Sequence, residues 1–265
     1  MNNEQRTGDK MKSNNPFKVH NIEHLSASKI NSWINDPAMF IATTLCGVKS
    51  KVGAGAFRGT SVEYALEKKL SNKDYNHNTI DEFLYSKFDS ECLENNISIY
   101  SERASKERKG LSSYYYQAIS LYNDFGEPQH YQHKIYYSLH DDLPIPFLGF
   151  IDFVFEDSIR DTKTTARMPS APSQGHQRQL AIYSKAFPEK ELWLDYITPK
   201  KSVSYKVNNV EQRINEVIKV AFGLQKFLSI SSDPLELASM VYPNYDDWMW
   251  SEDMKQQAKQ IWSNE

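Results

Sequence analysis

The chain has 265 residues, of which 40% are hydrophobic and 13% aromatic, and its 31 basic and 34 acidic residues give a net charge of -3. Because single domains usually run to about 100–200 residues, this length fits one elaborated domain and excludes two independent enzymes. The mean hydropathy of -0.64 and the lack of an apolar run near the roughly 18 residues of a membrane span predict no membrane insertion. The polar N-terminus carries no secretory signal, so we expect a cytoplasmic protein.

Cysteine content and local charge narrow the kinds of site that the chain can build. Only Cys46 and Cys92 are present, which excludes a disulfide scaffold, a four-cysteine zinc site and a cysteine-ligated iron–sulfur cluster. Any metal must therefore bind to carboxylates or histidines. Residues 158–206 hold nine Lys or Arg against four Asp or Glu, whereas residues 231–265 hold two against seven. If nucleic acid is a partner, we expect it to contact the first of these stretches.

The N-terminal part of the chain combines a polar tail with a short helix. Residues 1–20 are polar and lack periodicity, which predicts a disordered tail. Ser26 or Ser28 is a suitable N-cap, and apolar residues follow it at helical spacing as far as Pro37. This pattern predicts a first helix that ends at the proline.

Further helices are expected before residue 127. Small residues at 53–59 predict a flexible segment, and Thr60 begins a run with apolar residues on one side, which predicts a second helix. Residues 72–126 indicate aromatic-rich helices interrupted by the charged segment 103–109, which is typical of a solvated face. Three consecutive tyrosines, Tyr114 to Tyr116, favour core packing over stacking on nucleic-acid bases.

After Pro128 the pattern changes to alternating β-branched and aromatic residues, which predicts strands. The first three strands are expected to form an antiparallel meander. The predicted strands are residues 130–139, 145–157, 158–166, 191–198 and 202–207. Helices are predicted at residues 174–187 and 209–229, followed by an acidic, tryptophan-rich tail. His130 and His133 are expected on opposite faces of their strand, which makes a zinc site there improbable.

Two acids and a lysine form the most informative group. Asp152 lies in an apolar strand, where a carboxylate is costly to bury without a partner. Asp161 and Lys163 are two residues apart in the next strand and therefore project from the same face, where an adjacent strand can bring Asp152 beside them. Oxygen ligands of this kind suit Mg²⁺ or Mn²⁺, which bind one or two carboxylates together with substrate phosphate oxygens. The natural substrate of such a site is a phosphodiester.

The order of the surrounding motifs resembles the PD-(D/E)XK nuclease superfamily, specifically its RecB-like branch, which includes phage exonucleases and CRISPR-associated adaptation nucleases. The resemblance runs from about Leu25 to Trp262. The matching motifs are an opening helix (LSASKINSWINDPAMF), an early helix (RGTSVEYALE), a Gly-x-x-Asp strand (GFIDFVF), Asp161-Thr162-Lys163, and the Gln-x-x-x-Tyr helix from Gln179 to Tyr183.

This resemblance implies a role for each matched residue. Asp152 and Asp161 become metal ligands, with the Thr162 carbonyl as a third protein ligand and Lys163 as the catalytic lysine. Gln179 and Tyr183 lie one helical turn apart and would face the site and the DNA strand, the alternative being ordinary packing of a helix against the sheet. His176 and Arg178, at the start of the same helix, could contact phosphate.

Two departures from the family pattern affect the metal prediction. Glu63 stands where many relatives place a metal-binding histidine, but other members use a glutamate from this helix, which would favour Mg²⁺; the alternative is a solvated face shared with Glu67. The cluster-bearing relatives have a cysteine before the proline of the first helix and three near the C-terminus. This chain has Asp36 there and no cysteine in its tail. We therefore expect no iron–sulfur cluster, with closure by packing of Trp248, Trp250 and Trp262.

The resemblance implies an α/β fold of the restriction-endonuclease type, with a mixed central sheet flanked by helices and an N-terminal helical part. Residues 21–265 would form one nuclease domain, divided into a helical part (21–127), a catalytic sheet core (128–207) and C-terminal helices with a tail (208–265). The expected function is Mg²⁺-dependent hydrolysis of DNA, as an exonuclease of phage-type recombination, replication or repair. A single-strand-binding or recombination protein is a conceivable partner. The alternatives are a structure-specific endonuclease and a DNA-end-binding module that does not cut.

Overall fold

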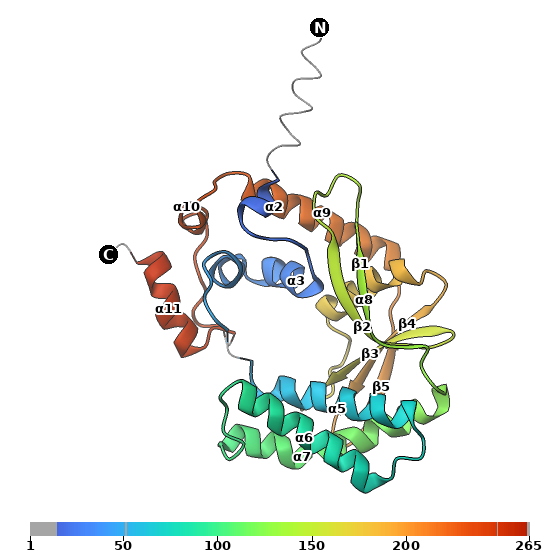
Figure 1. Cartoon of the computed structure of the whole chain (residues 1–265). Coiled ribbons are helices and arrows are strands. Elements are labelled where there is room, and N and C mark those ends of the chain that lie inside the picture. Colours follow the sequence, from blue (N-terminus) through green and yellow to red (C-terminus); the bar gives the residue numbers. More distant parts are fainter. Residues whose placement is uncertain (1–14, 51, 248, 264–265) are drawn as a thin grey trace. The chain divides into compact units, whose positions relative to one another are not determined.

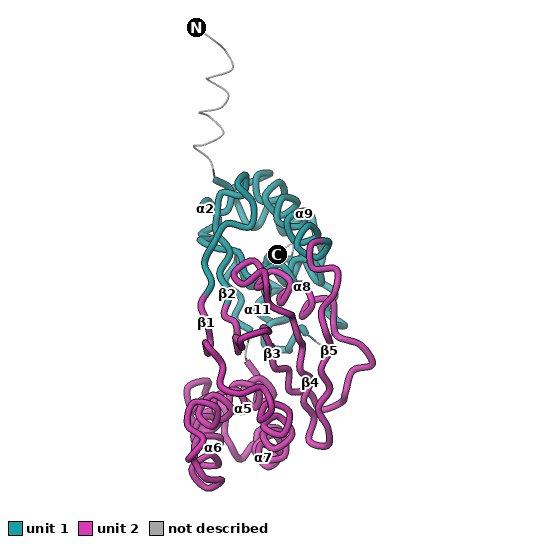
Figure 2. Tube along the Cα trace, turned by 90° about the vertical axis from the view of Figure 1, so that its right-hand side faces the viewer, with its two compact units in different colours: residues 1–50, 135–149, 212–265 teal, residues 51–134, 150–211 magenta. Residues whose placement is uncertain are grey.

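The computed structural model describes residues 15–50, 52–247 and 249–263. The chain forms two compact units, coloured separately in Figure 2. Unit 1 comprises Met1–Ser50, Ile135–Gly149 and Gln212–Glu265, and unit 2 comprises Lys51–Lys134 and Phe150–Glu211. All the predicted site residues belong to unit 2, so the site can be described within that unit.

A five-stranded mixed sheet, with the order β1-β2-β3-β4-β5, gives the chain its α/β character (Figure 1). The strands are β1 (His130–Tyr137), β2 (Phe147–Val154), β3 (Ser158–Thr164), β4 (Glu191–Ile197) and β5 (Ser202–Lys206). β2 and β3 pair antiparallel, β3 and β4 parallel, and β4 and β5 antiparallel. The parallel pair requires a crossover, which contains helix α8 (Gln174–Tyr183). The five predicted strands are confirmed within a few residues at their ends.

Three helices of unit 2 form a bundle: α5 (Ala54–Ser71), α6 (His77–Glu94) and α7 (Glu102–Tyr122). Their apolar faces share one core with Phe153 and Phe155. Tyr114 and Tyr115 are 4% and 2% exposed, which confirms the prediction of core packing for these two, whereas Tyr116 is 40% exposed.

Two predictions about this bundle were wrong. The segment 53–59 is not a flexible linker, because α5 already begins at Ala54, and burial of Ala54 and Phe57 outweighs the weak helix propensity of the glycines. The charged segment 103–109 does not interrupt the helices but lies inside α7. Two of its charges are paired with neighbouring helices: Glu107 binds Arg58 of α5, and Arg108 binds Asp89 of α6 through two bonds of 2.7 and 2.8 Å. Arg103, Lys106 and Lys109 are exposed, in agreement with the predicted solvated face.

Unit 1 is built largely from helices. They are α2 (Pro16–Val19), α3 (Ala27–Asn35), α4 (Pro37–Phe40), the π-helical turn η1 (Ile41–Leu45), most of α9 (Val210–Leu228), α10 (Pro234–Ala238) and α11 (Glu252–Trp262). The predicted disordered tail is wrong for residues 15–20, which form α2 with a fully buried Phe17, while residues 1–14 lie outside the described part. Ser26 caps α3 as predicted. No helix of the described chain has both the length and the apolar character needed to cross a bilayer.

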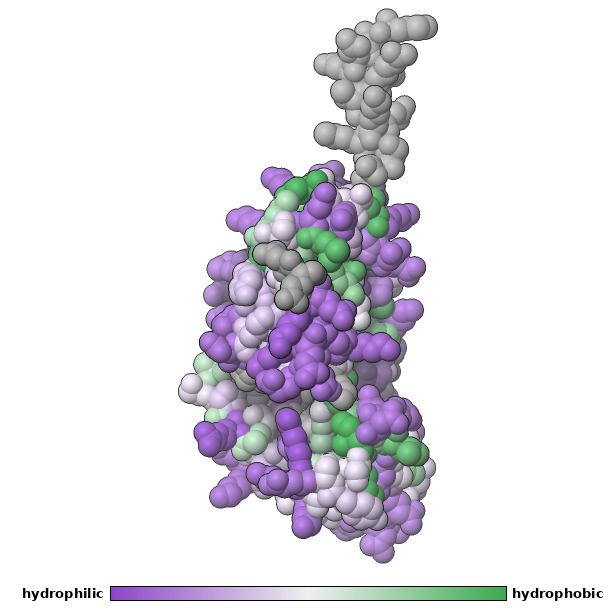
Figure 3. Space-filling model, turned by 90° about the vertical axis from the view of Figure 1, so that its left-hand side faces the viewer, coloured by the Kyte–Doolittle hydropathy of each residue, from purple (hydrophilic) through white to green (hydrophobic). Residues whose placement is uncertain are grey.

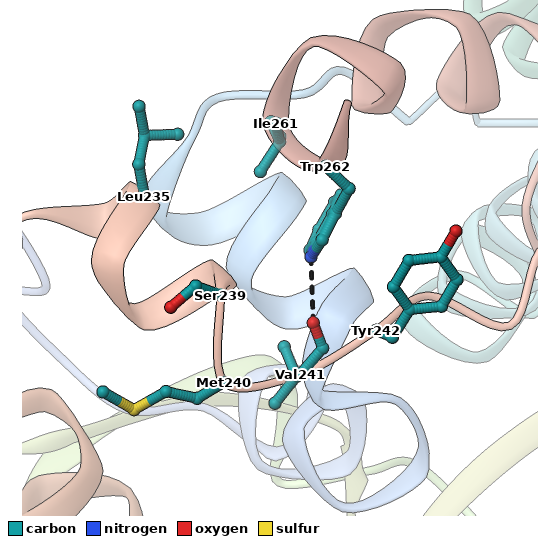
Figure 4. Close-up of a pocket in the computed structure, with 7 residues that line it drawn as sticks. All are labelled: Leu235, Ser239, Met240, Val241, Tyr242, Ile261 and Trp262. Carbon is teal, nitrogen blue, oxygen red and sulfur yellow. Dashed lines mark hydrogen bonds between the residues drawn. The ribbon is translucent and has the colours of Figure 1, made fainter. Parts of the chain in front are cut away.

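Tryptophans join the two ends of the chain within unit 1. The Trp250 indole Nε1 donates to Asp36 Oδ2 at 2.7 Å, and the Trp250 and Trp262 rings meet edge to face with centroids 6.3 Å apart. Trp262 Nε1 donates to the Val241 carbonyl at 3.0 Å beside a hollow of about 450 Å³ (Figure 4). The predicted closure by tryptophan packing is confirmed for these two residues, whereas Trp248 lies outside the described residues. Seen from the side of α11, hydrophilic side chains dominate the surface (Figure 3).

Candidate active site

The site lies where β2 and β3 stop pairing. Their ladder includes the pairs Phe153–Arg160 and Val154–Ile159, and Asp152 and Asp161 are the next residue on each strand. There the Thr162 N–H donates to Asp152 Oδ2 at 3.1 Å. In an extended strand, the N–H and C=O of one residue point to the same side, so the Thr162 carbonyl is directed to the same side as this N–H. Ligation of a metal by the Thr162 carbonyl stays a prediction.

Alternation along β3 brings Asp161 and Lys163 to one face, as predicted. Lys163 Nζ lies 2.7 Å from Asp161 Oδ2, and Gln179 Nε2 donates to Asp161 Oδ1 at 3.2 Å. Gln179 also donates to the Tyr183 hydroxyl at 3.1 Å, so helix α8 contributes both of its predicted residues to the site. The Lys163 ammonium is therefore the charged partner of the buried Asp161 Oδ2, while Asp161 Oδ1 accepts from Gln179.

The buried charged groups of the site shift one another's pKa values. Burial, followed by the nearby Asp161 charge, raises the pKa of Asp152 to about 7, against partial relief from Lys163 and from the Gln132 amide, which donates to Asp152 Oδ1 at 3.4 Å. Burial lowers the pKa of Lys163, but Asp161, Asp152 and Glu63 outweigh burial and raise this pKa above its usual value. Two carboxylates and one ammonium leave an excess of negative charge, which favours binding of a cation.

Glu63 reaches the same electrostatic environment from helix α5. Burial raises the pKa of Glu63 well above its usual value, as do Asp152 and Asp161, while Lys163 opposes them. Within the described residues, however, no three His, Cys, Asp or Glu side chains stand close enough together to hold one ion. The structure thus brings Glu63 near the aspartates, and direct ligation by Glu63 stays a prediction.

The residues present fit a hard divalent cation. Asp152, Asp161 and the Thr162 carbonyl offer oxygen donors only, and the two buried carboxylates share a single ammonium, so one negative charge is left for a cation to balance. Mg²⁺ typically takes one or two carboxylates and fills its other positions with water and phosphate oxygens, so a third carboxylate is not needed. The donor set contains no soft ligand, which agrees with the choice of Mg²⁺ or Mn²⁺.

Arg58, which sequence reasoning missed as a site residue, fixes α5 against the end of β3. Its Nε donates to Thr164 Oγ1 at 3.2 Å, and its NH2 group donates to the Thr164 carbonyl at 3.1 Å. The adjacent Gly59 also packs against this residue, since a Cβ there would be in van der Waals contact with Thr164 Oγ1 at 3.4 Å. Since Thr164 follows Lys163, Arg58 sets the position of α5, and so of Glu63, relative to the lysine.

A second missed group lies on the opposite face of the sheet. Arg160 binds Asp195 through two bonds of 2.8 and 3.0 Å, and both side chains are almost fully buried. The Tyr122 hydroxyl bonds both Asp195, at 2.9 Å, and Thr162 Oγ1, at 2.8 Å. This network holds Thr162, the residue between Asp161 and Lys163, from the face of the sheet opposite to the site. Because Arg160 directly precedes Asp161 in β3, the sequence places the two side chains on opposite faces of the sheet. The sequence around Arg160 does not show that Asp195 is its partner.

Two histidine predictions have different outcomes. His176 lies near the site: burial, followed by Lys163, lowers the pKa of its imidazole, and its Nδ1 is 2.7 Å from the Tyr196 hydroxyl. The prediction that His130 and His133 lie on opposite faces was wrong, because their ring centroids are only 4.7 Å apart. The cause is Gln132, whose φ of 44° is left-handed and breaks the alternation of β1 as a bulge does.

Comparisons with protein families, curated proteins and solved structures gave a weak structural likeness. No family model matches the chain, and no curated protein matches it. Among solved structures, the chain is similar to one described as "Crystal structure of SSO0001", with 20% sequence identity and a TM-score of 0.35. The likeness covers 63% of this chain and 86% of that one.

Proposed function

We propose that the protein is a Mg²⁺-dependent deoxyribonuclease that hydrolyses phosphodiester bonds and acts from DNA ends as an exonuclease, on a fold of the restriction-endonuclease type. The observation that carries this proposal is the convergence of Asp152, Asp161 and Lys163 where β2 and β3 part. The ammonium lies 2.7 Å from one carboxylate, and the Thr162 N–H binds the other. An ion pair that served only to stabilise the fold would need one acid for the lysine. Here two buried acids lie beside one lysine, which is costly and is more typical of a functional site.

Each residue would have a distinct role in hydrolysis. Asp152, Asp161 and the Thr162 carbonyl would hold the cation, which supplies polarisation of the phosphate and activation of water when bound. Lys163 keeps its proton because the acids raise its pKa, so its ammonium orients the attacking water and stabilises the charge that develops on the phosphate. Gln179 fixes Asp161 and the Tyr183 hydroxyl, and thereby maintains the orientation of the carboxylate.

One assay tests this function against its two alternatives. Purified protein and Mg²⁺ are incubated with end-labelled linear, closed circular and single-stranded DNA. Progressive loss of nucleotides from the ends supports the exonuclease, and nicking of closed circles supports the structure-specific endonuclease. Binding without cleavage identifies the module that grips DNA ends without cutting, and overturns the nuclease proposal.

A further inference from the structure

A hollow in unit 2, separate from the one described in unit 1, lies beyond the ends of β3 and β4. It has a volume of about 340 Å³ and is lined by Ala166, Met168, Thr198, Pro199, Lys200 and Lys201. β3 and β4 are parallel, with Lys163 beside Tyr196 and Thr164 beside Ile197, so the loops that follow them start at the same edge of the sheet. Ligands of α/β sheets commonly bind outside the carboxyl ends of parallel strands.

The walls of this hollow are fixed by hydrogen bonds. Thr198 Oγ1 donates to the Lys201 carbonyl at 2.9 Å and accepts from the Lys201 N–H at 3.1 Å, which sets the backbone of the loop that carries both lysines. On the other side, Thr165 Oγ1 donates to the Arg167 carbonyl at 2.9 Å, and the Thr165 N–H donates to the Ile197 carbonyl at 2.8 Å. The hollow is thus preformed.

Its side chains combine positive charge with an apolar floor. Lys200, Lys201 and the neighbouring Arg167 are exposed, and no described carboxylate lies within ion-pair distance of them. Ala166, Met168 and Pro199 supply the apolar surface. A small organic anion would use the lysines alone, whereas a nucleotide would also bring its sugar and base into van der Waals contact with the apolar surface.

The hollow is close to the catalytic lysine. Ala166 is three residues after Lys163, and three extended residues span at most about 11 Å. A DNA strand whose scissile phosphate lies at Lys163 therefore comes within reach of the hollow with a neighbouring nucleotide. Duplex DNA keeps its bases stacked inside, so only an unpaired nucleotide can place a base against Met168 and Pro199.

We propose that this hollow, which we call the Lys200–Lys201 subsite, binds an unpaired nucleotide of the DNA strand next to the scissile phosphate. Lys200 and Lys201 contact the flanking phosphates, and Met168 and Pro199 contact the sugar and base. The proposal rests on the proposed function, since it takes DNA as the substrate. It adds a preference for strands that are single-stranded beside the cleavage site.

Binding is measured on the full-length chain in Ca²⁺, a hard ion expected to occupy the site without supporting cleavage, with a labelled single-stranded oligonucleotide at several salt concentrations. Removing two phosphate contacts from a single strand lowers the slope of log affinity against log salt by about 1.4. We expect this change for the double variant Lys200→Ala/Lys201→Ala. The matched control is Lys106→Ala/Lys109→Ala on α7, which removes the same charge from exposed positions elsewhere and should leave the slope unchanged.

A third variant tests the apolar floor. Met168→Gln keeps the length of the side chain and should weaken binding of the single strand at every salt concentration without changing the slope, while binding of a blunt duplex hairpin stays as in the wild type. Equal slopes for both lysine pairs would overturn the subsite, and equal loss on single strand and hairpin would overturn its preference for unpaired DNA. Because binding is measured without cleavage, failure of the nuclease assay and failure of the subsite remain distinguishable.

Discussion

At the scale of single residues, the site depends on carboxylates that are costly to ionise. Asp152 is 9% exposed and Asp161 is 1% exposed, yet each must carry a negative charge to hold a cation. The protein meets part of this cost with the Thr162 N–H, the Gln132 and Gln179 amides and the Lys163 ammonium. Because of the remaining cost, we expect the stability of the fold to depend on pH and, if the proposed function holds, on Mg²⁺.

Asp152→Asn should reveal this dependence. The pKa of Asp152 is about 7 in the fold and 3.8 normally, so its contribution to stability is complete below about pH 4 and is lost as the pH rises through 7. In metal-free buffer, the variant should therefore melt several degrees higher than the wild type above pH 7, and at an equal temperature below pH 4. Mg²⁺ should raise the melting temperature of the wild type but not of the variant, which should also lose cleavage. A lower melting temperature for the variant at pH 8 would contradict this account.

Lys163→Ala separates chemistry from binding. Its ammonium is assigned to the attacking water and to transition-state charge, which matter more for the rate than for the affinity of the ground state. The variant should cleave orders of magnitude more slowly, while its affinity for DNA in Ca²⁺ changes much less. If affinity falls in step with rate, Lys163 is an electrostatic clamp and its catalytic role has to be withdrawn.

At the scale of elements, the decisive contact is that of α5 with β3. Arg58 is the clamp: it binds both oxygen atoms of Thr164, pairs with Glu107 and lies over the Tyr114 ring, with its guanidinium carbon 4.6 Å from the ring centroid. Through Arg58, α5 is fixed both to β3 and to α7. Because α5 also carries Glu63, the same contacts position Glu63.

Arg58→Lys should impair this alignment, because an ammonium cannot make two directed bonds to Thr164 and one to Glu107. We expect a higher Mg²⁺ requirement and a lower kcat, measured by metal titration of the cleavage rate. The control is Arg108→Lys, since Arg108 has a similar setting, with a bidentate bond to Asp89 and the Tyr85 ring at 4.8 Å, but it binds within the α6–α7 pair. An equal shift of the Mg²⁺ requirement in both variants would show that general loss of stability is the cause.

Glu63 and Glu67 offer a second comparison on α5. Glu63→Gln should raise the Mg²⁺ requirement because it removes a charge that acts on Lys163 and the aspartates. Glu67→Gln should change it little, since the side chain of Glu67 is 33% exposed and contacts Lys68 at 3.9 Å. An unchanged metal titration for Glu63→Gln would return Glu63 to a structural role.

At the scale of the whole molecule, sequence reasoning succeeds where the signal is local. The five strands follow from alternation, and the shared face of Asp161 and Lys163 follows from their spacing. Pairings that join distant segments carry no such signal: Arg58 meets Thr164 across 106 residues, and Arg160 meets Asp195 across 35. The break in the alternation of β1 was missed for another reason. Gln132 adopts a left-handed conformation that is uncommon for a residue other than glycine, and the pattern of apolar residues does not indicate it.

The junction between the two ends of unit 1 can be tested with Trp250→Phe. This change keeps an aromatic ring but leaves Asp36 Oδ2 without its indole donor, which should cost about 1–3 kcal/mol in the free energy of unfolding. Trp262→Phe is the control, since its indole donates to the neutral carbonyls of Ala238 and Val241 and its loss should cost less. Urea denaturation measures both. A larger cost for Trp262→Phe would show that ring packing, rather than the bond to Asp36, closes the junction.

The same junction also affects how the protein is made. Asp36 and Trp250 are joined by a hydrogen bond and surrounded by a small apolar cluster that includes Ala38, Ala42, Met254 and Ala258. Asp36 and Trp250 are 214 residues apart in the sequence, so the Asp36 carboxylate has no indole donor while the residues between them are being synthesised. Unit 1 can therefore close at this junction only after synthesis has passed Trp250, long after the helix-capping Asp36 has left the ribosome.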